Sequence, residues 1–177
     1  KDLLRIVHMV RDDKGSRALD SDQPLVEAFS RQAYQVEWIR CCNFSANNST
    51  RVALQAVASA DILLGMHGAG LTHSYWLRKR GVVVDILAEK PDQSSWYYKD
   101  LGYHTSYVSF ALSIPTNNRR AIMNRTIADS IASCAIAIVY KKYDGKKHLR
   151  TQICNPRTSP GLVGQYLATT ISPSPPV

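Results

Sequence analysis

Chemistry is concentrated in one stretch of the chain, residues 61–73, which read Asp-Ile-Leu-Leu-Gly-Met-His-Gly-Ala-Gly-Leu-Thr-His. The apolar run at 62–66 predicts a buried strand, and apolar residues at helical spacing after the glycines predict a helix to about Lys79. The first turn of a helix has N–H groups without helical partners, and glycine lets that backbone approach a ligand closely. The stretch therefore predicts an anion site built on backbone N–H groups, those of Gly68, Ala69, Gly70 and Leu71.

Two side chains in this stretch extend the predicted anion site. His67 directly precedes the glycines, where it can donate a hydrogen bond to a phosphate oxygen, and Thr72 follows in the first helical turn. His73 has the character of a supporting or packing residue. The spacing fits neither the dinucleotide-binding fingerprint nor a phosphate-binding Walker loop. The alternative is a tight turn between strand and helix that binds nothing.

The elements that must position these residues alternate along the chain. Strands are expected at 3–10, 36–40, 62–66, 82–87 and 104–110, and helices at 24–33, 50–60, 71–79, 95–101 and 118–137. This alternation predicts an α/β fold, a Rossmann-like parallel sheet with helices on both faces. Ligands of such sheets bind beyond the carboxyl ends of the strands. That rule brings together Arg11 after the first strand, His67 after the third and Asp85 near the end of the fourth.

Residues 61–73 also resemble the signature of glycosyltransferase family 61, which includes protein N-acetylglucosaminyltransferases and plant arabinoxylan glycosyltransferases. The similarity extends over about residues 3–110. It implies a GT-B architecture of two Rossmann-like halves, of which this chain resembles the C-terminal, donor-binding half. It further implies an inverting enzyme with a UDP-sugar donor, no cofactor and no metal. The sequence nominates no catalytic base.

The resemblance also gives roles to three charged residues. Arg11 and Arg17 stand where the family has two arginines, and their guanidinium groups can hold the diphosphate of the donor. The asparagine that usually follows the second arginine is absent here. Asp85 stands where the family usually has glutamate, and its carboxylate can accept hydrogen bonds from the ribose hydroxyls. Arg78 replaces the proline of the usual Leu-Pro pair.

Composition limits the class of protein. The chain has 177 residues, of which 45% are hydrophobic and 20% charged, as in an ordinary globular domain. Most of the net charge of +8 comes from the last third, where 9 basic and 2 acidic residues follow position 118.

We expect a nucleotide-sugar-binding domain at 1–115, a helical and basic extension of it at 116–150, and a Ser/Thr/Pro-rich tail at 151–177. The start at Lys1 and the lack of an apolar run near 20 residues suggest a piece of a longer protein whose membrane segment lies elsewhere.

The cellular compartment is argued from asparagine and cysteine. Four Asn-x-Ser/Thr sequons occur, at Asn43, Asn47, Asn48 and Asn124, and glycosylation there requires the lumen of the secretory pathway, either endoplasmic reticulum or Golgi. The four cysteines lack metal-ligand spacing, and a disulfide such as Cys42 to Cys154 is compatible with that lumen.

The sequence thus predicts the donor-binding half of a glycosyltransferase that transfers a sugar, such as GlcNAc or a pentose, to a protein or polysaccharide. The alternative is a non-catalytic or degenerate nucleotide-binding module from a truncated glycosyltransferase gene. A nucleic-acid-binding domain rests only on the basic last third, which lacks aromatic interleaving and any recognition motif, so we expect no nucleic-acid partner.

Overall fold

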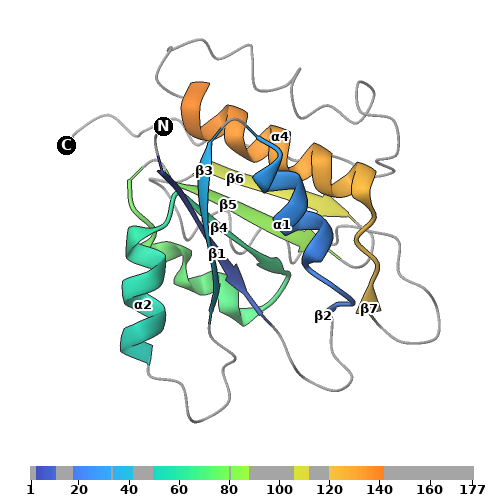
Figure 1. Ribbon diagram of the computed structural model, residues 1–177. Coiled ribbons are helices and arrows are strands. Elements are labelled where there is room, and N and C mark those ends of the chain that lie inside the picture. The colour runs from blue at the N-terminus through green and yellow to red at the C-terminus, as the bar shows by residue number, and fades with distance from the viewer. Residues whose placement is uncertain are drawn as a thin grey trace.

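The computed structural model describes residues 3–10, 18–32, 34–41, 50–79, 81–87, 106–111 and 120–141. Five parallel strands form one sheet in the order β3-β1-β4-β5-β6, and β2 and β7 form a two-stranded parallel ladder (Figure 1). The elements are β1 (Leu3–Met9), β2 (Ala18–Leu19), α1 (Gln23–Ser30), β3 (Gln35–Cys41), α2 (Thr50–Ser59), β4 (Ile62–Met66), the 3₁₀ helix η1 (Ala69–Trp76), β5 (Val82–Leu87), β6 (Ser106–Ala111), β7 (Arg120–Ala121) and α4 (Arg125–Lys141). The predicted α/β fold with a Rossmann-like parallel sheet is confirmed.

The order of the strands creates a switch point at β1. Numbered by their order in the chain, the five strands of the main sheet lie in the order 2-1-3-4-5. The chain leaves β1 toward β3 on one side, and the later strands are added on the other side, beginning with β4. In open α/β sheets a ligand lies beyond the carboxyl ends of the strands at such a point. A ligand is therefore expected to bind at the segments that follow β1 and β4.

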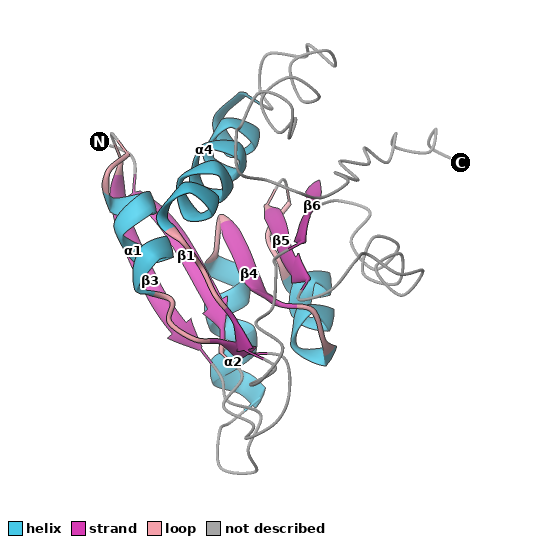
Figure 2. Cartoon of the chain, turned by 90° about the vertical axis from the view of Figure 1, so that its right-hand side faces the viewer, coloured by secondary structure: helices cyan, strands magenta, loops and turns pink. Residues whose placement is uncertain are grey.

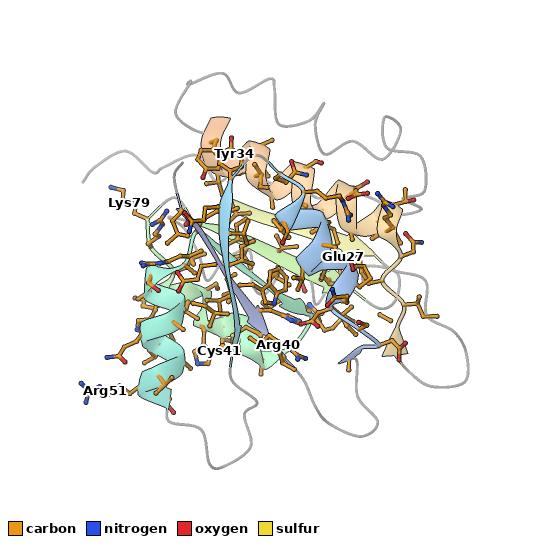
Figure 3. The ribbon with its side chains drawn as sticks, in the orientation of Figure 1. Glu27, Tyr34, Arg40, Cys41, Arg51 and Lys79 are labelled. Atoms are coloured by element: carbon orange, nitrogen blue, oxygen red, sulfur yellow. The ribbon has the colours of Figure 1, made fainter. Side chains whose placement is uncertain are left out.

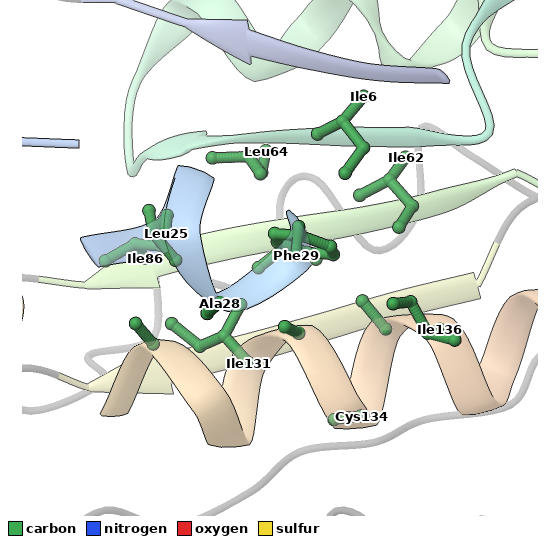
Figure 4. Packing of buried hydrophobic residues seen from close by; sticks show 14 of the residues in the cluster. Ile6, Leu25, Ala28, Phe29, Ile62, Leu64, Ile86, Ile131, Cys134 and Ile136 are labelled. Carbon is green, nitrogen blue, oxygen red and sulfur yellow. The ribbon is translucent and has the colours of Figure 1, made fainter. Parts of the chain in front are cut away.

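Helices cover both faces of the sheet (Figure 2). Alternate strand residues such as Ile6, Ile62 and Val84 pack with α1 and α4 in one cluster, which also holds Phe29 and Ile131 (Figure 4). Their neighbours in sequence point to the other face, where a second cluster packs against α2 and η1; its members include Val7, Leu63, Leu71 and Val83. Strands β4 and β5 are buried along their whole length, which explains why their sequences are continuous apolar runs.

Asp61 fixes the amino edge of the sheet. Its backbone N–H donates to the carbonyl of Arg5 at 2.8 Å, and its side chain accepts from the N–H of Arg5 at 2.9 Å. Its carbonyl accepts from the N–H of Val82, also at 2.8 Å, and the carboxylate forms an ion pair with Arg78. Asp61 thus joins β1, β4 and β5 at the edge opposite the predicted anion site. Arg78, which departs from the family pattern, acts at this distant edge.

The helix that follows the glycines differs from the predicted one in its type and in its last residue. It is a 3₁₀ helix that stops at Trp76, and Leu77 is already extended. Leu71, Ser74 and Leu77 are all buried, and this spacing of three matches the 3₁₀ period better than the α-helical one. Gly81 does not end the helix. A Cβ at Gly81 would lie 2.5 Å from Cγ of Leu77, so glycine here makes room for a core leucine.

The last helix begins later than predicted. Residues 120–121 form β7, and Oδ1 of Asn124 accepts the N–H of Ile127 at 2.9 Å, which caps α4. The helix then runs to Lys141 and packs against α1 and the sheet as part of the main core. The helix expected at 95–101 and the tail expected at 151–177 lie outside the described residues.

Candidate functional site

The turn after β4 carries the predicted anion site. The N–H of His67 donates to the carbonyl of Ile86 at 2.8 Å and extends the pairing with β5 by one residue. Gly68 is fully extended, and η1 begins at Ala69. The N–H of Leu71 already donates to the carbonyl of Gly68 at 3.0 Å, and the Leu71 side chain is buried in the core. Of the four predicted donors, Leu71 is thus used within the turn, and those of Gly68, Ala69 and Gly70 remain for a ligand.

His67 is held by Asp85, which the sequence placed at the same edge of the sheet without indicating a direct bond between the two. Nδ1 of His67 lies 2.8 Å from Oδ2 of Asp85, and the two residues are 6% and 0% exposed. A carboxylate only accepts hydrogen bonds, so Nδ1 carries the proton, and any ligand that binds this ring does so through Nε2. We expected Asp85 to accept from a ribose. Its partner in the structure is His67, which places Asp85 behind the turn.

Glycine is required in β4 beside this pair. Gly65 is the register partner of Asp85, and a Cβ at Gly65 would lie 3.1 Å from the carbonyl oxygen of Met9 and 3.6 Å from the side chain of Leu71. The absence of a side chain lets β1 and η1 approach β4 closely. The glycine in the middle of the apolar run thus brings the start of η1 onto the sheet.

Thr72 and His73 bind the turn itself. Oγ1 of Thr72 donates to the carbonyl of Ala69 at 2.6 Å, and Nδ1 of His73 lies 3.1 Å from the carbonyl oxygen of Gly70. His73 is 8% exposed, in agreement with the supporting role expected for it. Ala69 is exposed, and Gly68, Gly70 and Thr72 are partly exposed, so solvent reaches the glycine turn.

A second His–Asp pair lies at the same edge on the opposite face of the sheet, and the sequence reasoning missed it. Nδ1 of His8 lies 2.9 Å from Oδ2 of Asp22, and the same oxygen forms an ion pair with Nε of Arg40 at 3.0 Å. Asp22 immediately precedes α1, but its side chain makes no capping bond. The available signal was a histidine within the apolar second half of β1, and His8 is 4% exposed.

Burial controls the protonation of His8. It lowers the pKa of His8 from its ordinary value of 6.5, and the charge of Arg40 acts in the same direction. The hydrogen bond and the charge of Asp22 act in the opposite direction and are outweighed. The neutral ring donates through Nδ1 to Asp22, and its edge lies against Trp38, with 5.8 Å between ring centroids.

The segment Asp20-Ser21-Asp22 has a spacing at which two carboxylates can bind one divalent cation. A cation bound there would contradict the expectation that the site needs no metal. The Asp22 carboxylate is hydrogen-bonded to His8 and paired with the Arg40 guanidinium, whose positive charge opposes a cation at the same oxygen. Within the described ranges there is no group of three or more His, Cys, Asp or Glu residues that could hold a metal ion.

Several predicted residues cannot be placed. Arg11 and Arg17, expected to contact the diphosphate, and the sequons at Asn43, Asn47 and Asn48 lie outside the described residues. The fourth sequon residue, Asn124, is exposed at the start of α4.

Cys41 and Cys134 are both disulfide-bonded. No helix in the described part of the chain is long and apolar enough to cross a membrane.

Fold and site together define an α/β protein whose sheet carries a buried His–Asp pair and a glycine-rich turn at its switch point. No protein-family model matches the chain. The chain is distantly similar to a glycosyltransferase, the EGF domain-specific O-linked N-acetylglucosamine transferase of Drosophila melanogaster. The two are 30% identical over 99 residues, which is 55% of this chain and 18% of the relative. The matched region is thus less than a fifth of the length of that enzyme.

Proposed function

We propose that this chain is the part of an inverting glycosyltransferase that binds a UDP-sugar. The observation that carries the proposal is the buried pair of His67 and Asp85, set against a glycine turn that opens at the switch point of the sheet. The similarity to a glycosyltransferase over 99 residues supports the same reading.

The turn offers what a diphosphate needs. Backbone N–H groups of Ala69 and Gly70 begin η1, and the positive end of the helix dipole lies there. His67 is proposed to bind a phosphate oxygen through Nε2 while Nδ1 stays bonded to Asp85. No acidic side chain lies in the first turn of η1, so nothing negative on that turn repels the phosphates.

Asp85 acts in this proposal as a positioning residue. Its carboxylate fixes the ring of His67 from below, and its 0% exposure keeps water from competing for that hydrogen bond. Arg11 and Arg17 are proposed to bind the diphosphate from the loop after β1, which follows the other strand at the switch point.

The acceptor and the compartment are also proposals. The relative is named for transfer to EGF domains, which supports a protein or polysaccharide acceptor for this chain as well. The disulfides at Cys41 and Cys134 and the exposed sequon at Asn124 favour the oxidising lumen of the endoplasmic reticulum or Golgi. No metal or cofactor is assigned to donor binding.

Calorimetric titration of the chain with UDP tests the proposal. A hydrogen bond to a charged group contributes roughly 1.5–3 kcal/mol, so His67→Ala should weaken UDP binding about ten- to a hundredfold. Gly70→Val should abolish it, because a branched side chain blocks the approach of the diphosphate to the backbone. Tyr75→Ala is the matched control, since Tyr75 lies on the same helix and is 57% exposed.

Uridine, which lacks phosphate, is the matched control ligand. Its weak binding should be the same in the wild type and in His67→Ala. Undiminished UDP affinity in both His67→Ala and Gly70→Val, with the circular dichroism spectrum intact, would show that the diphosphate is not bound at this turn.

A further inference from the structure

We propose that His8, Asp22 and Arg40 form the subsite that binds the sugar hydroxyls of the donor. This inference rests on the proposed function, because it extends the ligand from the diphosphate turn to the neighbouring strands. The three residues come from β1, from the residue before α1, and from β3, and they meet at the carboxyl edge of the sheet. Arg40 lies at that end of β3 in Figure 3, whereas Lys79 lies at the opposite edge.

The cluster lies at the correct distance from the turn. His8 is the register partner of Leu64 on the adjacent strand, and His67 comes three residues after Leu64. One strand spacing of about 4.8 Å and three residues of about 3.3 Å each place the Cα atoms of His8 and His67 roughly 11 Å apart. A sugar ring attached directly to a diphosphate spans a distance of this order. Because the cluster and the turn lie on opposite faces of the sheet, a ligand that contacts both has to cross the carboxyl edge at the switch point.

The mixture of donors and acceptors fits a neutral polyhydroxyl group. Oδ2 of Asp22 is hydrogen-bonded to His8 and forms an ion pair with Nε of Arg40, and the Arg40 side chain is 63% exposed. The terminal amino groups of a guanidinium donate, and the second oxygen of a carboxylate accepts, which is the complement of a pair of hydroxyls. Within the described part of the chain no residue is hydrogen-bonded to Nε2 of His8.

Other ligands fit this cluster less well. The negative charge of Asp22 opposes a phosphate, and the positive charge of Arg40 opposes a metal ion. An apolar ligand would leave the carboxylate and guanidinium without water or partners, which is costly. Trp38, packed against both His8 and Phe29, gives the cluster a rigid apolar wall of the kind that supports polar groups in ligand sites.

The test compares UDP with two nucleotide sugars on the full chain. UDP, UDP-GlcNAc and UDP-xylose are titrated by calorimetry, and the affinity of the better nucleotide sugar divided by the affinity of UDP measures the contribution of the sugar. In the wild type we expect the nucleotide sugar to bind about tenfold more tightly, since two added hydrogen bonds give about this gain. Arg40→Met should reduce the ratio to about one and leave UDP affinity within about twofold.

A matched variant separates the subsite from a general loss of charge. Arg5 also bonds a carboxylate through Nε, at 2.7 Å from Glu37, and is 44% exposed, but it lies toward the amino edge of β1. Arg5→Met should keep the tenfold ratio. Asp22→Asn provides a second variant that retains the size of the side chain, and it too should lower the ratio.

Each outcome decides a different point. A ratio of one in the wild type, or a ratio preserved in both Arg40→Met and Asp22→Asn, would overturn the sugar subsite while the proposed function stands. Failure of the wild type to bind UDP at all would instead remove the proposed function and this inference with it. A tenfold ratio that is lost only in the two cluster variants would establish the subsite.

Discussion

Nδ1 of His67 and Oδ2 of Asp85 lie 2.8 Å apart and join the turn after β4 to the neighbouring strand β5. Both residues are buried, and the backbone of His67 is itself bonded to Ile86 of that strand. The ring is therefore oriented by the sheet and not by the loop. A histidine held in this way is preorganised, so a ligand does not have to order it on binding.

The pair predicts a non-additive mutational effect. If Asp85 acts through His67, Asp85→Asn should weaken UDP binding by less than His67→Ala does, and should have no further effect in the double variant. Calorimetry on the two single variants and the double variant measures the coupling. Asn keeps the size of Asp and one oxygen acceptor, which limits damage to the buried strand.

A direct contact between Asp85 and a ribose would give the opposite pattern. The loss caused by Asp85→Asn would then persist in the His67→Ala background, and uridine would be weakened as much as UDP. The uridine titration thus distinguishes the positioning role from the ribose role that the sequence suggested.

Donor binding should not require a divalent metal. The turn offers backbone N–H groups and His67, and the Asp22 carboxylate is bonded to Arg40. We expect the UDP dissociation constant to change by less than about twofold when EDTA is added or Mn²⁺ is supplied. A large loss of affinity on chelation would contradict this, and Asp20 and Asp22 would then be the first carboxylates to substitute.

Asp61 should matter for stability and not for the ligand. Asp61→Ala leaves the part-buried N–H of Arg5 without its acceptor, which costs roughly 1–3 kcal/mol of unfolding free energy. Arg78→Ala should cost less than about 1 kcal/mol, because Arg78 is half exposed and its ion pair is screened. Urea denaturation measures both values. UDP affinity of the folded variants should equal that of the wild type, since this edge lies opposite the turn.

His8 should make stability depend on pH. The pKa of His8 in the folded state is lowered from its ordinary value of 6.5. As the pH falls, the unfolded chain therefore binds a proton at His8 before the folded chain does. The stability associated with the neutral His8 ring is fully present above about pH 6.5. It is lost as the pH falls from there through the lowered pKa of the folded state. Urea denaturation between about pH 7.5 and 5 should show a smaller decline for His8→Gln than for the wild type. Identical pH profiles would contradict the assignment.

Asn124 should be glycosylated on expression through a eukaryotic secretory route. The residue is exposed, and the capping bond to Ile127 uses Oδ1, whereas the glycan attaches to the side-chain nitrogen. Intact mass before and after glycosidase treatment measures occupancy, with Asn124→Asp as a control that keeps a capping oxygen. An unshifted mass in a chain shown to have passed through the lumen would count against the site.

Much of the fold was available from the sequence because local patterns were unambiguous. Apolar runs bounded by polar residues marked β4 and β5, and Pro24 marked the start of α1. The position of His67 at a carboxyl edge followed from the alternation of strands and helices alone. The sequence did not predict that η1 is a 3₁₀ helix. The period of three depends on which of its side chains pack into the second core cluster.

The sequence by itself determined that an apolar strand leads into His67 and a glycine turn, and that strands and helices alternate around it. The same alternation placed His67 and Asp85 at one edge of the sheet, but only the tertiary structure decided which side chains contact one another there. Asp85 lies 18 residues from His67, and Asp22 lies 14 from His8, and no local pattern relates the members of either pair. The order and register of parallel strands bring each pair together, because long crossovers separate neighbouring strands in the chain and the carboxyl edge gathers their ends.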